Sequence, residues 1–176
     1  MPHENLWAPW RMEYIRGLTA EPSGEAAGPC FLCDAGRCVS GGEEASQRLV
    51  LLSDDRGVLL LNRFPYTSGH LLVAPREHGG DLAELTAAKR AGLMELAALG
   101  QVLLTQAIHP QGFNLGMNQG RCAGAGVPGH LHMHVVPRWN GDTNFIHVCG
   151  NIRVVPQALE ESFAALERTL KVVERG

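Results

Sequence analysis

The chain has 176 residues, of which 45% are hydrophobic and 19% are charged. This length and composition are typical of one globular domain with a single buried core. The formal net charge is -3 with 15 basic residues, which gives no broad electrostatic footprint for nucleic acid, so we expect no nucleic-acid partner.

The sequence predicts neither a membrane span nor a signal peptide. No apolar run approaches the roughly 20 residues that cross a bilayer, and residues 1–5 lack the basic and apolar regions of a leader. Five cysteines, two of them in a Cys-x-x-Cys pair, fit a reducing compartment and a metal or thiol site better than a disulfide framework. We therefore expect a cytoplasmic protein with no membrane partner.

Residues 1–47 are expected to form an N-terminal extension that contains the Cys-x-x-Cys pair. Its opening, residues 6–15, is dense in aromatic side chains and should dock on the domain or on a partner subunit, because many exposed rings are a liability. A linker or loop follows up to Pro29, and the composition of residues 36–47 predicts a mobile segment.

Strand-like segments begin after Arg48. Residues 49–52 and 58–61 are apolar runs separated by Ser-Asp-Asp-Arg-Gly, which predicts a hairpin. A Pro/Gly-punctuated loop over 62–69 leads into a further strand, residues 70–74, which Pro75 ends.

Helices are predicted from capping residues and apolar spacing. Residues 81–84 resemble a capping box with Asp in place of Ser or Thr, which predicts the start of a short helix. Residues 87–108 carry leucines at three- and four-residue spacing and predict a long amphipathic helix that covers one face of the sheet. A C-terminal helix over 156–176, with Pro156 at its start, is predicted by the apolar stripe Leu159, Phe163, Leu166, Leu170 and Val173.

Two more strands, residues 113–117 and 131–136, flank a Gly-rich loop over 118–129, and residues 145–149 form a possible last strand. The order of strands, helices, strands and helix indicates an α+β fold in which an antiparallel sheet packs on helices. We assign the main domain to residues 48–155.

Three histidines alternate with apolar residues in the strand over 131–136 and just before it. Because side chains repeat their direction every two residues along a strand, His130, His132 and His134 should project from one face. Satisfied or surface histidines would be a poor use of a strand face, so we favour a reactive or metal-binding site.

As catalysts, these histidines suit attack on phosphorus. A neutral imidazole is a good nucleophile near pH 7, and an aligned neighbour can hold its tautomer and stabilise the cation that forms. The Gly-rich loop enters this strand directly, and its backbone N–H groups are suited to cradling phosphate oxygens. Beside such a site we favour ligand contacts, rather than a purely structural role, for Arg138 and Trp139.

As metal ligands, the histidines pair with the Cys-x-x-Cys motif. Cys30 and Cys33 have a chelating spacing, and a Cys₂His₂ set is common for structural zinc. The two histidines of the set would be His78 and one of the three on the later strand. A pair of reduced thiols is the alternative, and a thioredoxin-like role is disfavoured because no strand-then-helix pattern frames the pair.

Residues 130–136, His-Leu-His-Met-His-Val-Val, resemble the motif His-φ-His-φ-His-φ-φ of the histidine-triad (HIT) superfamily of nucleotide hydrolases and transferases. Residues 61–73 look like the nucleoside-binding loop and strand of that superfamily, and residues 114–118 match a third motif. Because three motifs occur in the right order over roughly residues 48–155, the chain is identified as a member of this superfamily.

Residues 137–145 and the aromatic opening resemble the bacterial diadenosine tetraphosphate phosphorylase branch, also called ATP adenylyltransferase-like. The resemblance implies an enzyme that converts diadenosine tetraphosphate and phosphate to ATP and ADP through a covalent nucleotidyl-histidine. It also implies a homodimer, with the long helix and a sheet edge at the interface. We expect no organic cofactor.

The resemblance also implies roles for single residues. His132 would be the nucleophile, while His134 and His70 would support it and the phosphates. Asn62 would meet the ribose, and Asn118 the phosphate side. By similarity to zinc-containing relatives, a structural Zn²⁺ would be held by Cys30, Cys33, His78 and His130, which leaves His132 free to react.

One departure concerns the Gly-rich loop. Where relatives carry a hydroxyl or amide side chain before the first histidine, this chain has Gly126 and Val127. The backbone N–H groups from Gly124 to Val127 are the candidate substitutes. Two other functions therefore stay open: a hydrolase of nucleoside phosphoramidates or dinucleoside polyphosphates, and a non-catalytic nucleotide-binding module.

Overall fold

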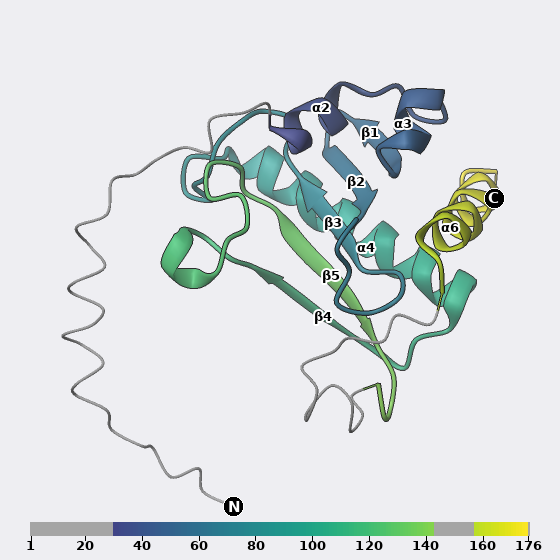
Figure 1. The fold of residues 1–176 in the computed structure, drawn as a ribbon. Helices are drawn as coiled ribbons and strands as arrows, with labels where there is room; N and C mark the ends of the chain where they lie inside the picture. The colour runs from purple at the N-terminus through teal and green to yellow at the C-terminus, as the bar shows by residue number, and fades with distance from the viewer. Residues whose placement is uncertain (1–29, 143–156, 176) are drawn as a thin grey trace, which may run out of the picture.

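A five-stranded antiparallel sheet carries the histidine strand in the computed structural model of the chain, which describes residues 30–142 and 157–175 (Figure 1). The strand order is β1-β2-β3-β5-β4. The strands are β1 (Val50–Asp54), β2 (Gly57–Leu61), β3 (Leu71–Ala74), β4 (Gly112–Met117) and β5 (Met133–Arg138). This order places the late strand β5 beside the early strand β3, so residues about 60 positions apart in the sequence meet in the sheet.

The predicted hairpin is β1 and β2, joined by a tight turn. The Asp54 carboxylate accepts a hydrogen bond from the main-chain N–H of Arg56 (2.9 Å) and pairs with its guanidinium group. Gly57 follows in a positive-φ conformation, and a Cβ there would lie 2.5 Å from the carbonyl oxygen of Ala74. A side chain at this position would therefore force β2 away from β3.

Helices cover both faces of the hairpin side of the sheet. Helix α4 (Ala87–Ile108) lies across one face, with α6 (Leu159–Val173) packed beside it, and α2 (Phe31–Arg37) and α3 (Glu43–Gln47) lie by β1 and β2 (Figure 1). Two apolar clusters result, because alternate residues of β2 point in opposite directions. Leu59 and Leu61 join the α4 cluster, whereas Val58 and Leu60 join the α2 cluster.

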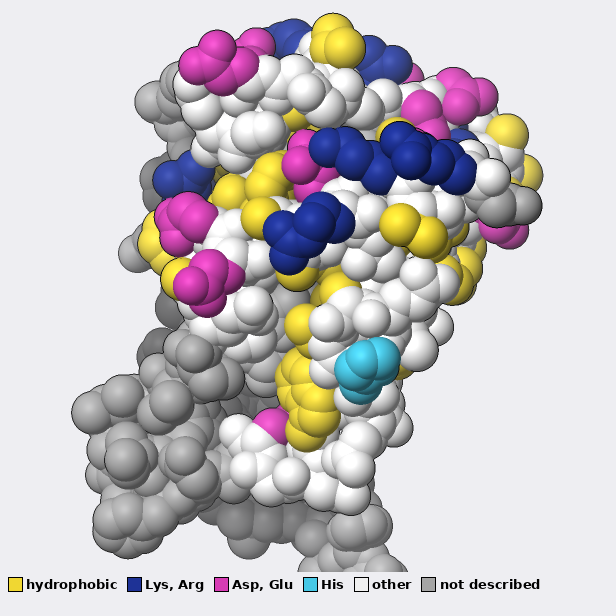
Figure 2. All heavy atoms as spheres, turned by 90° about the vertical axis from the view of Figure 1, so that its right-hand side faces the viewer, with side chains coloured by type: hydrophobic (Ala, Val, Ile, Leu, Met, Phe, Trp, Pro, Cys, Tyr) yellow, Lys and Arg dark blue, Asp and Glu magenta, His cyan; other side chains and the backbone are white. Residues whose placement is uncertain are grey.

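The C-terminal helix has the predicted amphipathic pattern. Phe163, Leu166 and Leu170 are buried, and Leu159 and Val173 pack against the same cluster. On the side of the molecule that includes α6, acidic and basic side chains are interspersed rather than separated (Figure 2). The predicted helix is confirmed from Leu159 onwards, while Pro156 lies outside the described residues.

Helix α4 confirms the predicted long helix, and it is also the one helix among the described residues long and apolar enough to cross a membrane. Its inner face packs into the core through residues such as Leu93, Leu96 and Leu103. The core helix of a soluble protein gives the same composition signal, so the signal is weak.

Three predictions of local structure were wrong. Residues 36–47 contain the end of α2 and all of α3 rather than one mobile segment, because Ala35 and Ala45 are buried against the sheet. Residues 81–84 form a turn instead of opening a helix, and the Asp81 carboxylate accepts from the N–H of Ala83. The cap of α4 is instead Thr86, whose hydroxyl accepts from the N–H of Lys89.

The third difference concerns where the histidine strand starts. Regular pairing in β5 begins at Met133 rather than Leu131, because β3 ends before Pro75, which has no N–H for the ladder. The N–H of Leu131 donates instead to the carbonyl oxygen of Gly79 (2.7 Å). His130 and His132 therefore lie in an irregular segment that joins β5 to the loop after β3.

Candidate active site

The site lies on the side of the sheet opposite α4. Met133 and Val135 point into the α4 cluster, so His134 between them points the other way. The strand register places Leu60 of β2 beside Leu72 of β3, and Leu72 beside His134 of β5. A row of three side chains thus leads across the sheet from an apolar surface to the histidines.

A chain of hydrogen bonds fixes the tautomers of two histidines. The N–H of Tyr66 donates to Nδ1 of His70 (3.1 Å), and the side-chain amide of Asn62 also approaches this nitrogen (3.3 Å). Because a main-chain N–H can only donate, His70 carries its proton on Nε2, which lies 2.9 Å from Nδ1 of His134. Neutral His134 then carries its own proton on Nε2, where it can donate to a phosphate oxygen.

His132 has the opposite arrangement. Its Nδ1 lies 2.9 Å from the carbonyl oxygen of His130, which can only accept, so the proton is on Nδ1 and the lone pair is on Nε2. The His132 and His134 rings lie with centroids 5.1 Å apart. The pair thus presents one nucleophilic nitrogen and one N–H donor to the same region.

Burial keeps His134 neutral near pH 7. Desolvation lowers its pKa from the ordinary 6.5, and the nearby His132 lowers it further. The pKa of His130 is lowered as well, mainly by desolvation, although the carbonyl oxygen of Pro75 opposes the shift.

The lowered pKa of His134 predicts a pH-dependent stability. The unfolded chain binds a proton at this position more tightly than the folded chain does. The folded state is therefore not penalised at this histidine above about pH 6.5, and its free energy of unfolding falls as the pH drops from there through the lowered pKa. We expect the free energy of unfolding to decrease from about pH 7 to about pH 5, and His134→Gln to show a smaller decrease. Urea denaturation across this range measures both slopes, and equal slopes would contradict the assignment.

Four side chains form a possible metal site beside His132. Sγ of Cys30 lies 3.3 Å and Sγ of Cys33 lies 3.4 Å from Nδ1 of His130, and Cys33 Sγ lies 3.3 Å from Nδ1 of His78. All four ligand atoms lie within 4.8 Å of one another. A zinc ion with ordinary bond lengths separates its sulfur and nitrogen ligands by about 3.5 Å, so the donor set fits tetrahedral zinc.

The ring of His130 is oriented for this role. Its Nε2 lies 2.8 Å from the carbonyl oxygen of Pro75 and must donate to it, which leaves the Nδ1 lone pair facing the sulfur atoms. Burial, and then the neighbouring Cys30, raise the pKa of the Cys33 thiol. A cation in the cluster would reverse this shift by stabilising the thiolates. By contrast, Cys38 and Cys122 are free thiols that do not belong to the cluster.

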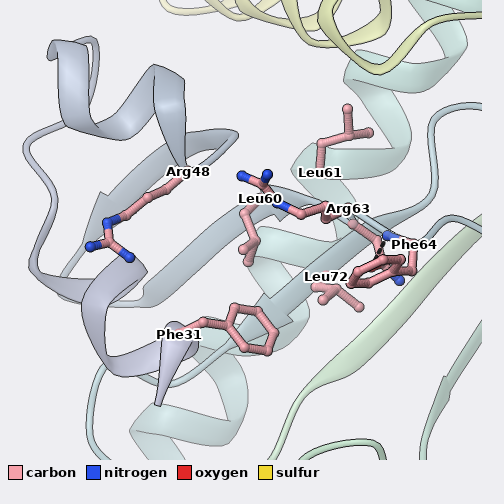
Figure 3. Close-up of a pocket in the computed structure, with 8 residues that line it drawn as sticks. Phe31, Arg48, Leu60, Leu61, Arg63, Phe64 and Leu72 are labelled. Carbon is pink, nitrogen blue, oxygen red and sulfur yellow. Dashed lines mark hydrogen bonds between the residues drawn. The ribbon is translucent and has the colours of Figure 1, made fainter. Parts of the chain in front are cut away.

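An open pocket of about 350 Å³ lies at Leu60 and Leu72, the two residues of the side-chain row that lead to His134. Phe31 from α2 and Phe64 from the loop after β2 approach Leu72 from two sides (Figure 3). The lining residues are Phe31, Arg48, Leu60, Leu61, Asn62, Arg63, Phe64 and Leu72. Of these, sequence reasoning singled out Asn62 alone, because pocket walls depend on which strands and helices become neighbours.

The sequence patterns also did not predict Tyr66 as a residue of the site. Its ring stacks on His134 with centroids 5.6 Å apart and an interplanar angle of 18°. The sequence signal was present, because Tyr66 lies four residues before His70 in a loop that returns tightly into β3.

The Gly-rich loop follows β4. The Asn118 amide donates to the carbonyl oxygen of Gly124 (3.4 Å), so Asn118 braces the loop from inside. Gly126 is exposed, with open space where a Cβ would point, and Val127 accepts from the N–H of His130. Phosphate contacts by these four residues stay a prediction.

The Gly-rich loop packs against Gly80 but not against the neighbouring Gly79, so the two positions give a matched pair of stability variants. A Cβ on Gly80 would overlap the carbonyl oxygen of Pro128, whereas a Cβ on Gly79 would meet open space. Because backbone must move in the first case, we expect Gly80→Ala to lower the free energy of unfolding by about 1–3 kcal/mol. Gly79→Ala is the control, and urea denaturation of the two variants is the measurement. Equal stabilities would contradict this packing.

Arg138 and Trp139 lie further along β5. Arg138 is four residues from His134, about 13 Å along the strand. Its guanidinium group pairs with Asp142 and donates to Asn114 (2.6 Å). The indole N–H of Trp139 donates to the carbonyl oxygen of His109 (3.3 Å). Contact of either side chain with a nucleotide stays a prediction.

Comparisons with known proteins show which proteins the chain resembles. The family model of the HIT domain matches residues 43–141. The AP-4-A phosphorylase of Mycobacterium tuberculosis is 33% identical over 170 residues, covering 90% of this chain and 80% of that protein. The adenosine 5'-monophosphoramidase hnt1 of Schizosaccharomyces pombe is 36% identical over 43% of this chain and 53% of its own length. A solved structure of a zinc-bound histidine triad family protein from Mycobacterium smegmatis has a TM-score of 0.64 and 28% identity, covering 86% of this chain and 99% of that chain.

Proposed function

We propose that this chain, which belongs to the HIT domain family, transfers a nucleotidyl group from a dinucleoside polyphosphate to inorganic phosphate through His132. The chain is an enzyme of the HIT type. One observation carries the role of His132 best: the hydrogen bond from its Nδ1 to the His130 carbonyl oxygen leaves the lone pair on Nε2 free to attack. The similarity to the AP-4-A phosphorylase of Mycobacterium tuberculosis supports phosphate as the acceptor.

The pocket suits the nucleoside part of such a substrate. Its apolar floor, Leu60 and Leu72, supports a flat base, and Phe31 offers an aromatic wall. From Leu60 across Leu72 to His134 the sheet spans two strand spacings, about 10 Å, which is the length of a nucleoside monophosphate. Asn62, at the edge of the pocket, would then meet the ribose.

The chemistry proceeds in two balanced steps. Nε2 of His132 attacks the α-phosphorus of diadenosine tetraphosphate, a P–N bond forms, and the P–O bond to the leaving ATP breaks. His134 donates its Nε2 hydrogen bond to a phosphate oxygen and so stabilises the negative charge that develops. An oxygen of inorganic phosphate then attacks the same phosphorus, the P–N bond breaks, and ADP leaves with His132 restored.

The metal cluster has a structural part in this scheme. Cys30, Cys33, His78 and His130 would hold Zn²⁺, which would cross-link the start of α2, the loop after β3 and the irregular segment before β5. With four protein ligands the site is closed, so the ion offers no open position to a substrate. The relative of known structure from Mycobacterium smegmatis is zinc-bound, which supports this reading.

The acceptor distinguishes the main proposal from its alternative. If water replaces phosphate in the second step, the products are ATP and AMP, and the enzyme is a hydrolase. The loop lacks a side-chain hydroxyl, and the N–H groups of Gly124 and Ala125 already donate to main-chain carbonyl oxygens within it, so phosphate contacts would depend on the backbone at Gly126 and Val127. The lack of a side-chain hydroxyl in the loop makes hydrolysis the second candidate reaction.

A product assay tests the choice directly. Diadenosine tetraphosphate is incubated with the enzyme, with and without inorganic phosphate, and the nucleotides are separated. We expect ATP and ADP with phosphate and little turnover without it. ATP and AMP in both reactions would replace the proposal with the hydrolase. Binding without turnover would indicate a nucleotide-binding module.

We also propose that two chains associate through β4 and α4 into a homodimer. Among the residues that the structure describes, β4 is an edge strand of the sheet, and an apolar groove beside it is lined by residues such as Met94 and Leu115, both of which are exposed. Mass photometry or analytical ultracentrifugation should give twice the chain mass, and Leu115→Lys should shift the protein to monomer. A monomeric wild-type protein would reject this interface.

A further inference from the structure

The metal cluster lies between the two halves of the nucleotide site. Cys30 and Cys33 flank Phe31, which lines the nucleoside pocket. On its other side, His130 provides both a ring nitrogen to the cluster and a carbonyl oxygen to His132. One group of four side chains is thus joined through the main chain to a wall of the pocket and to the attacking residue.

We propose that a metal ion in this cluster positions the nucleotide site from both sides. Through His130 it fixes the orientation and tautomer of His132, and through the cysteine pair it holds Phe31 over the pocket. The ligands act as positioning residues, because none of them touches the reacting atoms. The catalytic consequence rests on the proposed function, whereas the effect on the His132 tautomer does not.

The histidine arm is held most firmly when both ring nitrogens of His130 are engaged, in addition to the main-chain hydrogen bond from Leu131 to Gly79. His130 is fully buried, its Nε2 donates to Pro75, and its Nδ1 faces Cys30 and Cys33 at 3.3 and 3.4 Å. A metal–nitrogen bond would fix the ring and, with it, the carbonyl group that accepts from His132. Without the metal, two weakly acidic thiols replace that bond, so the ring and the main chain that presents the carbonyl group are held less firmly and the hydrogen bond to His132 weakens.

The cysteine arm holds a short helix by its first turn. Helix α2 has seven residues, and its N-cap, Cys30, makes no side-chain capping hydrogen bond. Leu32 and Ala35 are buried against the sheet, whereas Phe31 is 46% exposed. Loss of the metal should therefore loosen the first turn while apolar contacts keep α2 on the sheet.

The tautomer of His132 provides a readout that does not depend on turnover. Imidazole nitrogen-15 shifts are measured by NMR in zinc-loaded protein and after zinc removal by a chelator, with His132→Asn used to assign the signals. We expect a single Nδ1–H tautomer for His132 with zinc and a mixture of both tautomers without it. A single unchanged tautomer in metal-free protein would overturn the proposal.

The kinetic readout separates the two arms. Single-turnover formation of the nucleotidyl-protein from diadenosine tetraphosphate is followed by intact mass, as a function of nucleotide concentration. We expect zinc removal to lower the maximal rate about 10- to 100-fold and to weaken nucleotide binding as well. Phe31→Ala should weaken binding alone, because it removes the wall and leaves His132 aligned. An unchanged maximal rate without zinc would reject the His130 arm.

A milder variant covers the case in which the metal-free chain unfolds. His78 is the exposed ligand of the cluster, so His78→Ala weakens metal binding and leaves the buried ligands in place. At limiting zinc it should show the mixed tautomer and slow nucleotidyl transfer, with a retained circular dichroism spectrum. Excess zinc should reverse both changes, and His78→Cys, which supplies a thiolate ligand, should restore both. If purified wild-type protein contains no bound zinc, the inference is overturned. If wild-type protein binds zinc and shows the tautomer change but forms no nucleotidyl-protein, the proposed function is refuted and the inference about the His132 tautomer stands.

Discussion

Replacing His132 with alanine is expected to abolish nucleotidyl transfer, with a rate loss of at least about 10,000-fold. His132 has its Nδ1 proton hydrogen-bonded to a carbonyl oxygen, so its Nε2 lone pair is the nucleophile of the proposed mechanism. A nucleophile that forms a covalent intermediate cannot be replaced by its neighbours, because His134 presents a proton where His132 presents a lone pair.

Intact mass spectrometry under acid-free quenching checks this result, since phosphoramidate bonds are acid-labile. The wild-type chain should gain one nucleotidyl group from diadenosine tetraphosphate, and His132→Ala should gain none. His109→Asn is a matched control, because His109 is exposed at the left-handed end of α4, where asparagine is tolerated. Nucleotidylation of His132→Ala at the wild-type rate would rule out His132 as the nucleophile.

The second large effect is expected for His70→Ala. His70 is fully buried and links the N–H of Tyr66 to Nδ1 of His134. Without it, His134 can place its proton on either nitrogen, so the donor to the phosphate is lost in part of the molecules. We expect the maximal rate to fall about 100- to 1,000-fold. This loss is larger than that expected when a residue is only mispositioned, and smaller than that expected when every molecule has the wrong tautomer.

The same substitution should lower stability by about 1–3 kcal/mol, because the main-chain N–H of Tyr66 loses His70 as acceptor and a cavity forms. His70→Gln keeps an amide donor near the position of Nε2, so it should retain more activity than His70→Ala. Steady-state kinetics and urea denaturation measure the two effects separately. Equal activities of His70→Ala and wild type would show that the hydrogen-bond chain has no catalytic part.

Local sequence patterns determined most of the secondary structure. Helix α4 and the buried part of α6 follow from apolar residues at helical spacing, and the β1–β2 hairpin follows from two apolar runs around a turn. The errors arose where tertiary contacts override local preference. Ala45 is buried against the sheet in a stretch whose composition suggested mobility. β5 starts later than predicted, because its partner β3 ends before Pro75.

For the site, the sequence by itself predicted that three histidines and a cysteine pair carry the chemistry, because their types and spacings are unusual in a structural strand. The separate tasks proposed for them came from the family resemblance, and only the tertiary structure supplied the contacts that support those tasks. Those tasks depend on which atom each ring nitrogen faces: a carbonyl oxygen for His132, the ring of His70 for His134, and two sulfur atoms for His130. Hydrogen-bond partners 55 to 100 positions away in the sequence set two of these three orientations, and no local pattern encodes such distant pairings. The pocket has the same origin, since Phe31, Leu60 and Leu72 become its walls only when α2, β2 and β3 pack together.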